Sequence, residues 1–401
     1  MYDIGGVRNP RPFKIRRVSH IGLNSIDTPA MLHCYRDLLG LVTTDESQNL
    51  ANRLDPDRSL IPEEEARPLY FFRYGGDHHQ FVLMDRRLWS LIDPEHAHIS
   101  INQFSWQIGS LQEISDSIQW LGGEEQRILR AGRDMPGSNW HTYVLDPLNG
   151  FTFELTFGME QVGWDRLSKP QASWEELRFH EFPQLPHQSE QSEIAEQKAK
   201  GVDVAAGFEP PLEVGPYVVG GIPLPRPFKI VGLGPFAFIV DDVDASAAYY
   251  QQKFGFELRY RASVNGVEFA ALACNAAHHA FVLYGPGARS AFGLAPDANL
   301  VGTGFQLASY RQLRDAVAFL TEQGLEEVDV PGELVPGFDH VAHLRDPDGN
   351  LIQLYFQMRQ CIGDDGRAGR PSITGPASSW PELIDPADDT FYGEVFMGPW
   401  A

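Results

Sequence analysis

Long apolar runs and paired cysteines are missing from this 401-residue sequence. Its best apolar stretch, Pro235–Val240, is far shorter than the roughly 18 residues that a membrane span requires. Residues 1–17 lack the apolar core of a secretory signal. Three cysteines (Cys34, Cys274 and Cys361) are too few for a disulfide framework and suit a reducing compartment. We therefore expect a cytoplasmic protein.

Basic residues are also scarce. The chain has 32 Lys and Arg against 54 Asp and Glu, which leaves a formal net charge of −22. Such a surface repels phosphate backbones and anionic lipids, so we expect neither nucleic acid nor membrane as a partner. Small molecules and other protein chains remain, and we expect a homo-oligomer. The 43% hydrophobic content predicts an ordinary globular protein of at least two domains.

An internal duplication organises the chain. The segment RPFKI at Arg11–Ile15 recurs unchanged at Arg226–Ile230. The pair His78-His79 recurs as His278-His279, and Asp146-Pro147 recurs as Asp346-Pro347. The spacing implies about 15 extra residues in the first copy, and the polar stretch 43–65 there predicts a loop insertion.

Each copy shows the same order of predicted elements. In the first copy a strand at Val18–Ile26 precedes a helix at Thr28–Gly40, and a later strand pair surrounds a Pro-Leu-Asn-Gly turn. The strands group as β-α-β-β-β, twice per copy. We predict a first domain at 12–165, a linker at 166–215, a second domain at 216–360 and a C-terminal tail at 361–401.

These motifs resemble the vicinal oxygen chelate superfamily of glyoxalases, bleomycin resistance proteins and extradiol dioxygenases. The matching features are His20 on the first strand, the helix end CYRDLLG, the double histidine, and the endings DPLNGFTFEL and DPDGNLIQL. The resemblance covers residues 12–160 and 227–357. It implies an α+β fold in which paired βαβββ modules form two curved mixed-sheet barrels. ACNAAHHAFVL and MPGSNWHTYVLDP look most like the two-domain type I extradiol ring-cleavage dioxygenases.

The resemblance also implies a metal site. The extradiol enzymes bind Fe(II) through two histidines and a glutamate. His20 and Glu154 match the first and last ligands, whereas the second histidine is replaced by Gln103. An inward core histidine is the alternative reading of His20, and His98 or His141 could replace Gln103 as ligand. Fe(II) is the expected metal, with Mn(II) or Zn(II) as alternatives.

The second copy lacks this ligand set. Its matching positions hold Pro235, Thr303 and Gln353, so no anionic ligand remains there. The extradiol dioxygenases usually keep their metal in the second half, and this chain departs from that pattern. We expect the metal in the first half and a structural role for the second.

The resemblance assigns further roles. His79 matches the residue that transfers a proton, and the ordinary histidine pKa of about 6.5 suits that role. Tyr143 matches a tyrosine that hydrogen-bonds metal-bound oxygens. A solvated histidine and a packed tyrosine are the alternatives. Substrate-binding candidates are Trp106, Phe104, Trp140 and His141, although aromatic residues in strands more often belong to the core.

Three functions follow. The first is an extradiol-type dioxygenase that cleaves a catechol-like ring with O2, in aromatic hydrocarbon catabolism. The second is a redox-neutral metal-dependent lyase or isomerase, in which Glu154 and His79 handle a proton. The third is a metal-free protein that binds a small molecule. Metal content separates the third from the other two, and oxygen uptake separates the first from the second.

Overall fold

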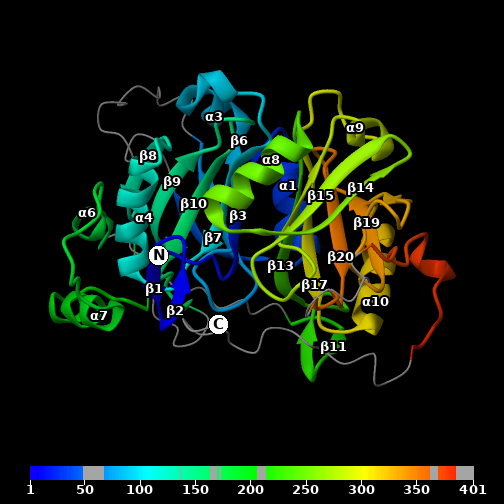
Figure 1. Ribbon diagram of the computed structural model, residues 1–401. Coiled ribbons are helices and arrows are strands. Elements are labelled where there is room, and N and C mark those ends of the chain that lie inside the picture. The colour runs from blue at the N-terminus through cyan, green and yellow to red at the C-terminus, as the bar shows by residue number, and fades with distance from the viewer. Residues whose placement is uncertain are drawn as a thin grey trace. The chain divides into compact units, whose positions relative to one another are not determined.

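The computed structural model describes residues 1–47, 67–135, 137–162, 169–170, 173–205, 214–361 and 369–384. Parts of the predicted insertion, linker and tail therefore lie outside the described residues. Contacts divide the chain into two units (Figure 1), one with Met1–Thr28 and Val42–Pro211 and the other with Pro29–Leu41 and Leu212–Met397. Among the described helices, none has the length and apolar character needed to cross a bilayer.

The first unit contains an eight-stranded mixed sheet in the order β4-β5-β6-β3-β7-β10-β9-β8. Within it β3 is parallel to β6, β7 is parallel to β10, and β3 joins the two modules by pairing antiparallel with β7. The strands are β3 (Arg17–Ser25), β4 (Val42–Ser47), β5 (Leu69–Arg73), β6 (Phe81–Asp85), β7 (Ile101–Gln107), β8 (Ile128–Gly132), β9 (Trp140–Leu145) and β10 (Thr152–Phe157). A separate hairpin joins β1 (Tyr2–Ile4) and β2 (Val7–Asn9).

The second unit repeats this sheet in the order β14-β15-β16-β13-β17-β20-β19-β18. Its strands are β13 (Ile230–Ile239), β14 (Glu257–Val264), β15 (Val267–Ala273), β16 (Phe281–Tyr284), β17 (Leu300–Leu307), β18 (Glu327–Val328), β19 (Val341–Arg345) and β20 (Leu351–Tyr355). The hairpin here joins β11 (Tyr217–Val219) and β12 (Ile222–Leu224). Two such sheets confirm the predicted α+β fold of paired βαβββ modules.

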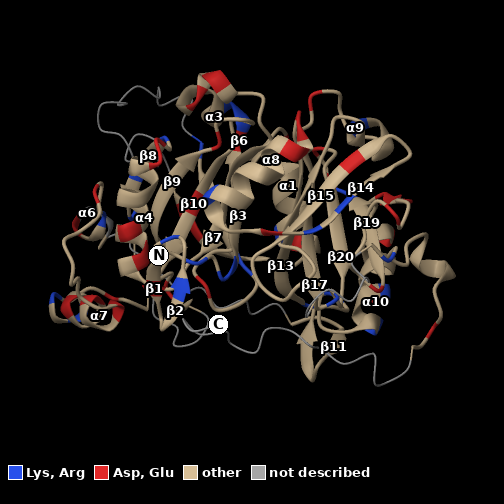
Figure 2. Cartoon of the chain, viewed as in Figure 1, with Lys and Arg blue, Asp and Glu red and all other residues tan. Residues whose placement is uncertain are grey.

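Helices complete each unit. In the first unit they are α3 (Arg86–Ile92), η4 (Pro94–His96), α4 (Leu111–Gly123), α6 (Trp174–Leu177) and α7 (Glu190–Ala199). In the second they include α8 (Val243–Tyr249), η6 (Tyr250–Phe254), α9 (Ala288–Ala291), α10 (Tyr310–Glu322) and η7 (Ala377–Ser379). Acidic side chains are distributed over both units (Figure 2), in keeping with the net charge of −22.

The two faces of the first sheet have different surroundings. Helix α4 packs on strands β8, β9 and β10, and its N-terminus is capped by Ser110, which accepts a hydrogen bond from the Glu113 N–H. Phe104 of β7 and Phe153 of β10 are fully buried and stack with ring centroids 5.7 Å apart. Because side chains alternate along a strand, Gln103 and Glu154 point to the opposite face. That face borders a cavity.

The predicted helix at Thr28–Gly40 differs from expectation in two ways. It consists of α1 (Thr28–Leu32) and a π-helical continuation, η1 (His33–Leu38), before Gly40 ends it with φ +81°. Although it follows β3 in the chain, Pro29–Leu41 belongs to the second unit. There the buried Tyr35 hydroxyl donates a 2.9 Å hydrogen bond to Asp346.

The described part of the linker contacts the first unit through buried charges. Arg133, which follows β8, donates hydrogen bonds of 3.0 and 2.9 Å to the two carboxylate oxygens of Glu193 on α7. Lys169 Nζ lies 3.1 Å from Glu193 Oε2, and all three side chains are at most 1% exposed. Ion pairs this deeply buried require close partners, so the linker is part of the first unit rather than a free tether.

Candidate functional site

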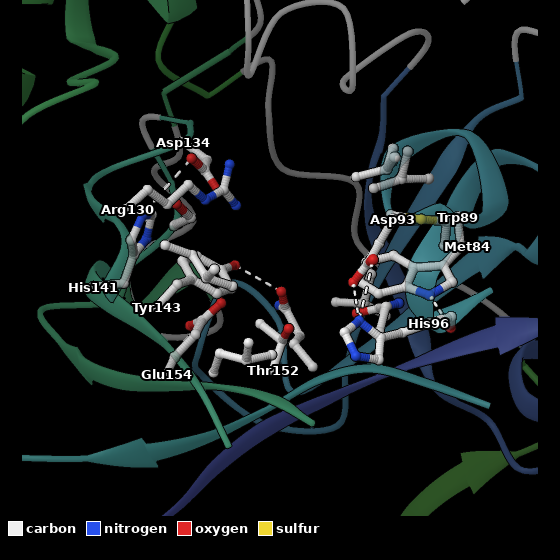
Figure 3. Close-up of a pocket in the computed structure, with 18 of the residues that line it drawn as sticks. Met84, Trp89, Asp93, His96, Arg130, Asp134, His141, Tyr143, Thr152 and Glu154 are labelled. Atoms are coloured by element: carbon white, nitrogen blue, oxygen red, sulfur yellow. Dashed lines mark hydrogen bonds and ion pairs between the residues drawn. The ribbon is translucent and has the colours of Figure 1, made fainter. Parts of the chain in front are cut away.

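The first unit encloses a cavity of about 1030 Å³. Figure 3 shows Arg130, Asp134, His141, Tyr143 and Glu154 on one side of it, and Met84, Trp89, Asp93 and His96 on the other. Strands β6, β7, β9 and β10 and the segment that contains α3 supply the lining. All of these lining residues belong to the first unit.

Three predicted metal ligands lie close together on adjacent strands; Gln103 and Glu154 line the cavity, and the fully buried His20 contacts both of them. His20 comes from β3, Gln103 from β7 and Glu154 from β10. His20 Nε2 lies 3.2 Å from Glu154 Oε2 and 3.2 Å from Gln103 Nε2. The pairing of β3 with β7 shifts register between Val18 and Ile21, and such a bulge re-aims the side chain that it contains, here His20.

Burial and the neighbouring imidazole set the charge of Glu154. The side chain is 1% exposed, and burial alone would raise its pKa. The interactions with His20, His141 and Tyr143 together outweigh burial and lower the pKa to about 2, and Asn139 Nδ2 donates a further hydrogen bond of 3.2 Å to Oε2. Glu154 is therefore a carboxylate at neutral pH, the form that binds cations.

The spacing of these atoms fits a metal ion. Donor atoms that bind one ion at about 2.1 Å lie roughly 3.0–3.4 Å from each other. The distance between His20 Nε2 and Glu154 Oε2, 3.2 Å, falls in that range, whereas the Gln103 atom 3.2 Å from His20 Nε2 is the amide nitrogen, which does not bind metals. Imidazole, amide oxygen and carboxylate are all ligands of first-row divalent metals. The Gln103 Oε1 atom faces Tyr143, so the amide has to turn about its last bond to offer oxygen. Among the described residues, no group of three His, Cys, Asp or Glu residues is arranged to hold a metal, so a metal here would need Gln103 as a ligand.

The double histidine is buried, not solvated. His78 is 0% exposed and His79 is 2% exposed. His79 lines the cavity, with its ring centroid 4.7 Å from that of His20, whereas His78 Nε2 lies 2.6 Å from Asp45 Oδ2. Burial, together with His20 and His78, holds the pKa of His79 well below its ordinary value, so its ring is neutral at pH 7.

A chain of hydrogen bonds sets which nitrogen of His79 carries its proton. If His78 in its neutral form donates from Nε2 to the Asp45 carboxylate, its Nδ1 is an acceptor. His79 Nδ1 lies 3.1 Å from that atom and donates to it. The lone pair of His79 is then on Nε2, which leaves this nitrogen as a base.

Tyr143 on β9 contacts the predicted ligands directly. Its hydroxyl donates a 2.6 Å hydrogen bond to Gln103 Oε1, and its ring lies 4.3 Å below the Arg130 guanidinium carbon. Burial and the Glu154 charge raise its pKa well above the ordinary value, so it remains a hydrogen-bond donor. His141, two residues earlier on the same face of β9, also lines the cavity, and burial lowers its pKa.

The structure places the other predicted substrate-binding residues elsewhere. Phe104 and Trp106 are 0% exposed on the face of β7 opposite Gln103. Trp140 packs against Phe179, Phe182 and His187 of the linker. None of the three aromatic residues lines the cavity. The alternative ligand His98 is exposed and outside the lining as well.

Several cavity residues were missed from the sequence. Arg130 could have been found, because β8 pairs with β9 and places it opposite Tyr143. Asn139 lies in the segment before β9, which has no periodic pattern to predict its direction. Ser105 Oγ lies 2.8 Å from His20 Nε2, and strand alternation from Gln103 predicts its inward direction.

The matching site in the second unit is closed. Its cavity measures only about 10 Å³ and is lined by Pro235 and Gln353, among others. Gln353 Oε1 lies 3.1 Å from His343 Nε2, and Thr303 is 1% exposed. With no carboxylate lining it, this cavity cannot hold the expected metal.

Comparison with known families and structures places this fold. Residues 232–354 match the model of the Glyoxalase/Bleomycin resistance protein/Dioxygenase superfamily. No curated protein sequence matches the chain.

Several solved structures share the fold over most of the chain. The Mn(II)-bound glyoxalase from Novosphingobium aromaticivorans is 12% identical (TM-score 0.51; 88% of this chain and 85% of that one). The 2,3-dioxygenase LapB from Pseudomonas sp. KL28 is 14% identical (TM-score 0.56; 88% and 95%). Homoprotocatechuate 2,3-dioxygenase from Arthrobacter globiformis is 17% identical (TM-score 0.52; 92% and 86%). At these identities the likeness concerns the fold alone.

Proposed function

Because residues 232–354 belong to the Glyoxalase/Bleomycin resistance protein/Dioxygenase superfamily and the first half of the chain repeats their fold, we propose that the first unit is the catalytic half of a metal-dependent dioxygenase that opens aromatic diol rings. One observation carries this proposal. His20, Gln103 and Glu154 meet within 3.2 Å contacts beside a cavity large enough for an aromatic substrate. Several structural neighbours are 2,3-dioxygenases, which supports the choice of reaction.

The three side chains would hold a divalent metal, Fe(II) for ring cleavage. That ion would supply the redox chemistry, passing electrons from the diol to O2. The carboxylate leaves one positive charge of the ion uncompensated, which attracts a diol that has lost a proton. Asn139 holds Glu154 through its hydrogen bond, and Ser19 Oγ lies 3.2 Å from Nδ1 of His20, the ring nitrogen that would not bind the ion.

Proton transfer falls to His79. Its neutral ring lines the cavity, and a His78 that donates to Asp45 and accepts from His79 would leave the His79 lone pair on Nε2. It can take a proton from a diol hydroxyl and return it later in the reaction. In the structure the Tyr143 hydroxyl donates a 2.6 Å hydrogen bond to Gln103 Oε1. If that oxygen turned toward an ion, the hydroxyl would instead be available to donate to a substrate oxygen, and the Arg130 guanidinium over its ring strengthens it as a donor.

Oxygen uptake tests the proposal. The full-length protein is loaded with Fe(II) without air and then mixed with aerated catechols of increasing size. We expect uptake of O2 that depends on the diol and is lost in Glu154→Gln, which keeps the shape of the side chain and removes its charge. Absence of uptake by a protein shown to contain iron would contradict the dioxygenase assignment.

A second variant tests the unusual ligand. If Gln103 binds the ion, Gln103→His should tighten Fe(II) binding, because imidazole is a stronger ligand than a neutral amide. Titration against a chelator measures this change. Equal or weaker binding would remove Gln103 from the ligand set.

One observation favours a redox-neutral reaction as the second candidate. An amide ligand is neutral and favours iron less than a second imidazole does, and one structural neighbour is a Mn(II)-bound glyoxalase. In that case Glu154 and His79 would move a proton on a substrate that the ion polarises. Substrate consumption that continues without O2 would identify this reaction.

A further inference from the structure

The cavity of the first unit is larger than the proposed ligand cluster needs. Its volume of about 1030 Å³ is at the upper end of the roughly 300–1000 Å³ typical of small-molecule sites. The cluster occupies one side, and the opposite side carries an apolar wall that includes Met84 and Trp89, with Asp93 and His96 next to it (Figure 3). Buried residues that form this apolar wall are Leu69, Phe71, Val82, Met84, Trp89 and Met135.

In the second unit, side chains fill the space that matches this cavity. Tyr284 ends β16 at the position that Met84 holds in β6, because Phe81 and Phe281 begin the two matching strands. Tyr284 packs into the buried core with Phe292 and donates a 2.7 Å hydrogen bond to the Leu334 carbonyl. The remaining cavity is about 10 Å³. The same fold thus has a large cavity where this position is Met84 and a nearly filled one where it is Tyr284.

The wall offers contact area and almost no polar groups. The Trp89 indole N–H is already satisfied by the His96 carbonyl at 3.1 Å, so the ring presents its apolar surface. Met84 is a flexible side chain that adapts to the shape of a ligand. Burial against such a wall favours an apolar group of substantial area.

The charges around the cavity disfavour an anionic substituent. Four carboxylates line it and only two guanidinium groups do, and one of these, Arg130, is paired with Asp134 at 2.5 Å. The lining charges are Asp93, Glu95, Asp134 and Glu154 against Arg127 and Arg130. A second negative group on the substrate would meet mainly carboxylates.

We propose that this cavity takes an uncharged aromatic compound larger than one ring, with its apolar substituent packed against Met84 and Trp89. The inference deepens the proposed function, since it assumes that the hydroxyl-bearing ring of this compound is the one that reacts. The position of Met84 sets the size limit. Tyr at this position would leave room for a single ring at most.

Binding of compounds that cannot react separates this inference from the proposed reaction. Phenol and 2-phenylphenol lack the second hydroxyl, 4-phenylbenzoate has a carboxylate and no hydroxyl, and titration calorimetry on the full-length protein measures their affinity. We expect 2-phenylphenol to bind at least about tenfold more tightly than phenol, which corresponds to about 1.4 kcal/mol. The anionic 4-phenylbenzoate should bind more weakly than 2-phenylphenol.

Met84→Tyr should remove the preference for the larger compound. Leu258→Tyr is the matched control, because it adds the same side chain at an exposed position on β14 of the second unit and should change nothing. If Met84→Tyr does not fold, Ile92→Trp narrows the same space from the end of α3.

Equal binding of phenol and 2-phenylphenol would overturn the inference, as would a folded Met84→Tyr protein that retains the preference. Tighter binding of the benzoate would overturn the assignment of an uncharged ligand. A protein that binds 2-phenylphenol as expected but takes up no O2 would keep this inference and refute the dioxygenase.

Discussion

His79 illustrates how one residue acquires its chemistry from its neighbours. From the sequence, His79 is a candidate for proton transfer only because it is the second histidine of a pair that resembles the one in the extradiol dioxygenases. The structure adds that burial lowers its pKa and keeps the ring neutral, and that its Nδ1 lies 3.1 Å from His78 Nδ1. The same pair in the second unit, His278 and His279, is equally buried but lines no cavity among those described.

We expect His79→Ala to keep the bound metal and to lower kcat by about 10²–10⁴-fold, the usual contribution of one acid–base group. The matched control is His279→Ala, which makes the same change in the second unit and should leave turnover intact. Steady-state kinetics with parallel metal analysis measures both effects. Unchanged turnover in a folded His79→Ala protein would exclude a role in proton transfer.

Strand alternation accounts for which site residues were predictable. His20, Gln103 and Glu154 were chosen from motif positions, and the structure brings them together. Phe104 and Trp106 are direct neighbours of inward-facing residues and therefore face the helix side, where they form core. Trp140 fails for the same reason, since His141 points inward.

At the scale of the element, the helix α1–η1 shows a limit of local reasoning. Its cap, apolar positions and terminal glycine predict a helix at the correct place. They do not reveal that Pro29–Leu41 belongs to the second unit. That placement depends on a partner more than three hundred residues away, the Asp346 carboxylate that accepts the Tyr35 hydrogen bond.

This buried contact predicts a pH dependence of stability. Burial raises the pKa of Asp346 to about 6, in spite of hydrogen bonds from Asn350 and Tyr35 that lower it. The folded chain thus keeps a proton that the unfolded chain releases near pH 4. Stability from this group is present below pH 4 and is lost as the pH rises to about 6, by an amount on the order of 2–3 kcal/mol.

Urea unfolding at pH 4.5 and pH 7 measures this effect. Asp346→Asn removes the titration, so the variant should lose less stability than the wild type between these two pH values. The exposed Asp244→Asn serves as the control, because the Asp244 pKa is lowered by its hydrogen bond with Arg261 and titrates below this window. Identical pH dependence in wild type and Asp346→Asn would contradict the prediction.

At the scale of the whole molecule, the two halves share a fold and differ in what the fold encloses. The first unit has a cavity with a carboxylate and an imidazole at one side, and the second has a filled core. The two units differ at three matching positions: the first has His20, Glu154 and Met84 where the second has Pro235, Gln353 and Tyr284.

This division predicts one tightly bound divalent metal per chain. Elemental analysis of the purified protein should give a ratio near one, falling toward zero in Glu154→Ala, because a buried site without its carboxylate cannot offset the charge of the ion. Gln353→Ala makes the corresponding change in the second unit and should leave the ratio unaltered. Two metals per chain would contradict the assignment of the second unit as structural.

Duplication, strand periodicity and turn chemistry are local or repetitive properties, so together with the family resemblance the residue order was enough to predict two copies of a βαβββ pair. The sequence did not predict three other features. These are the size of the cavity, the direction of Trp140 and the unit to which α1–η1 belongs. They depend on contacts between residues distant in the chain. Such contacts form only when the whole chain folds, because each side chain packs into the volume that the others leave.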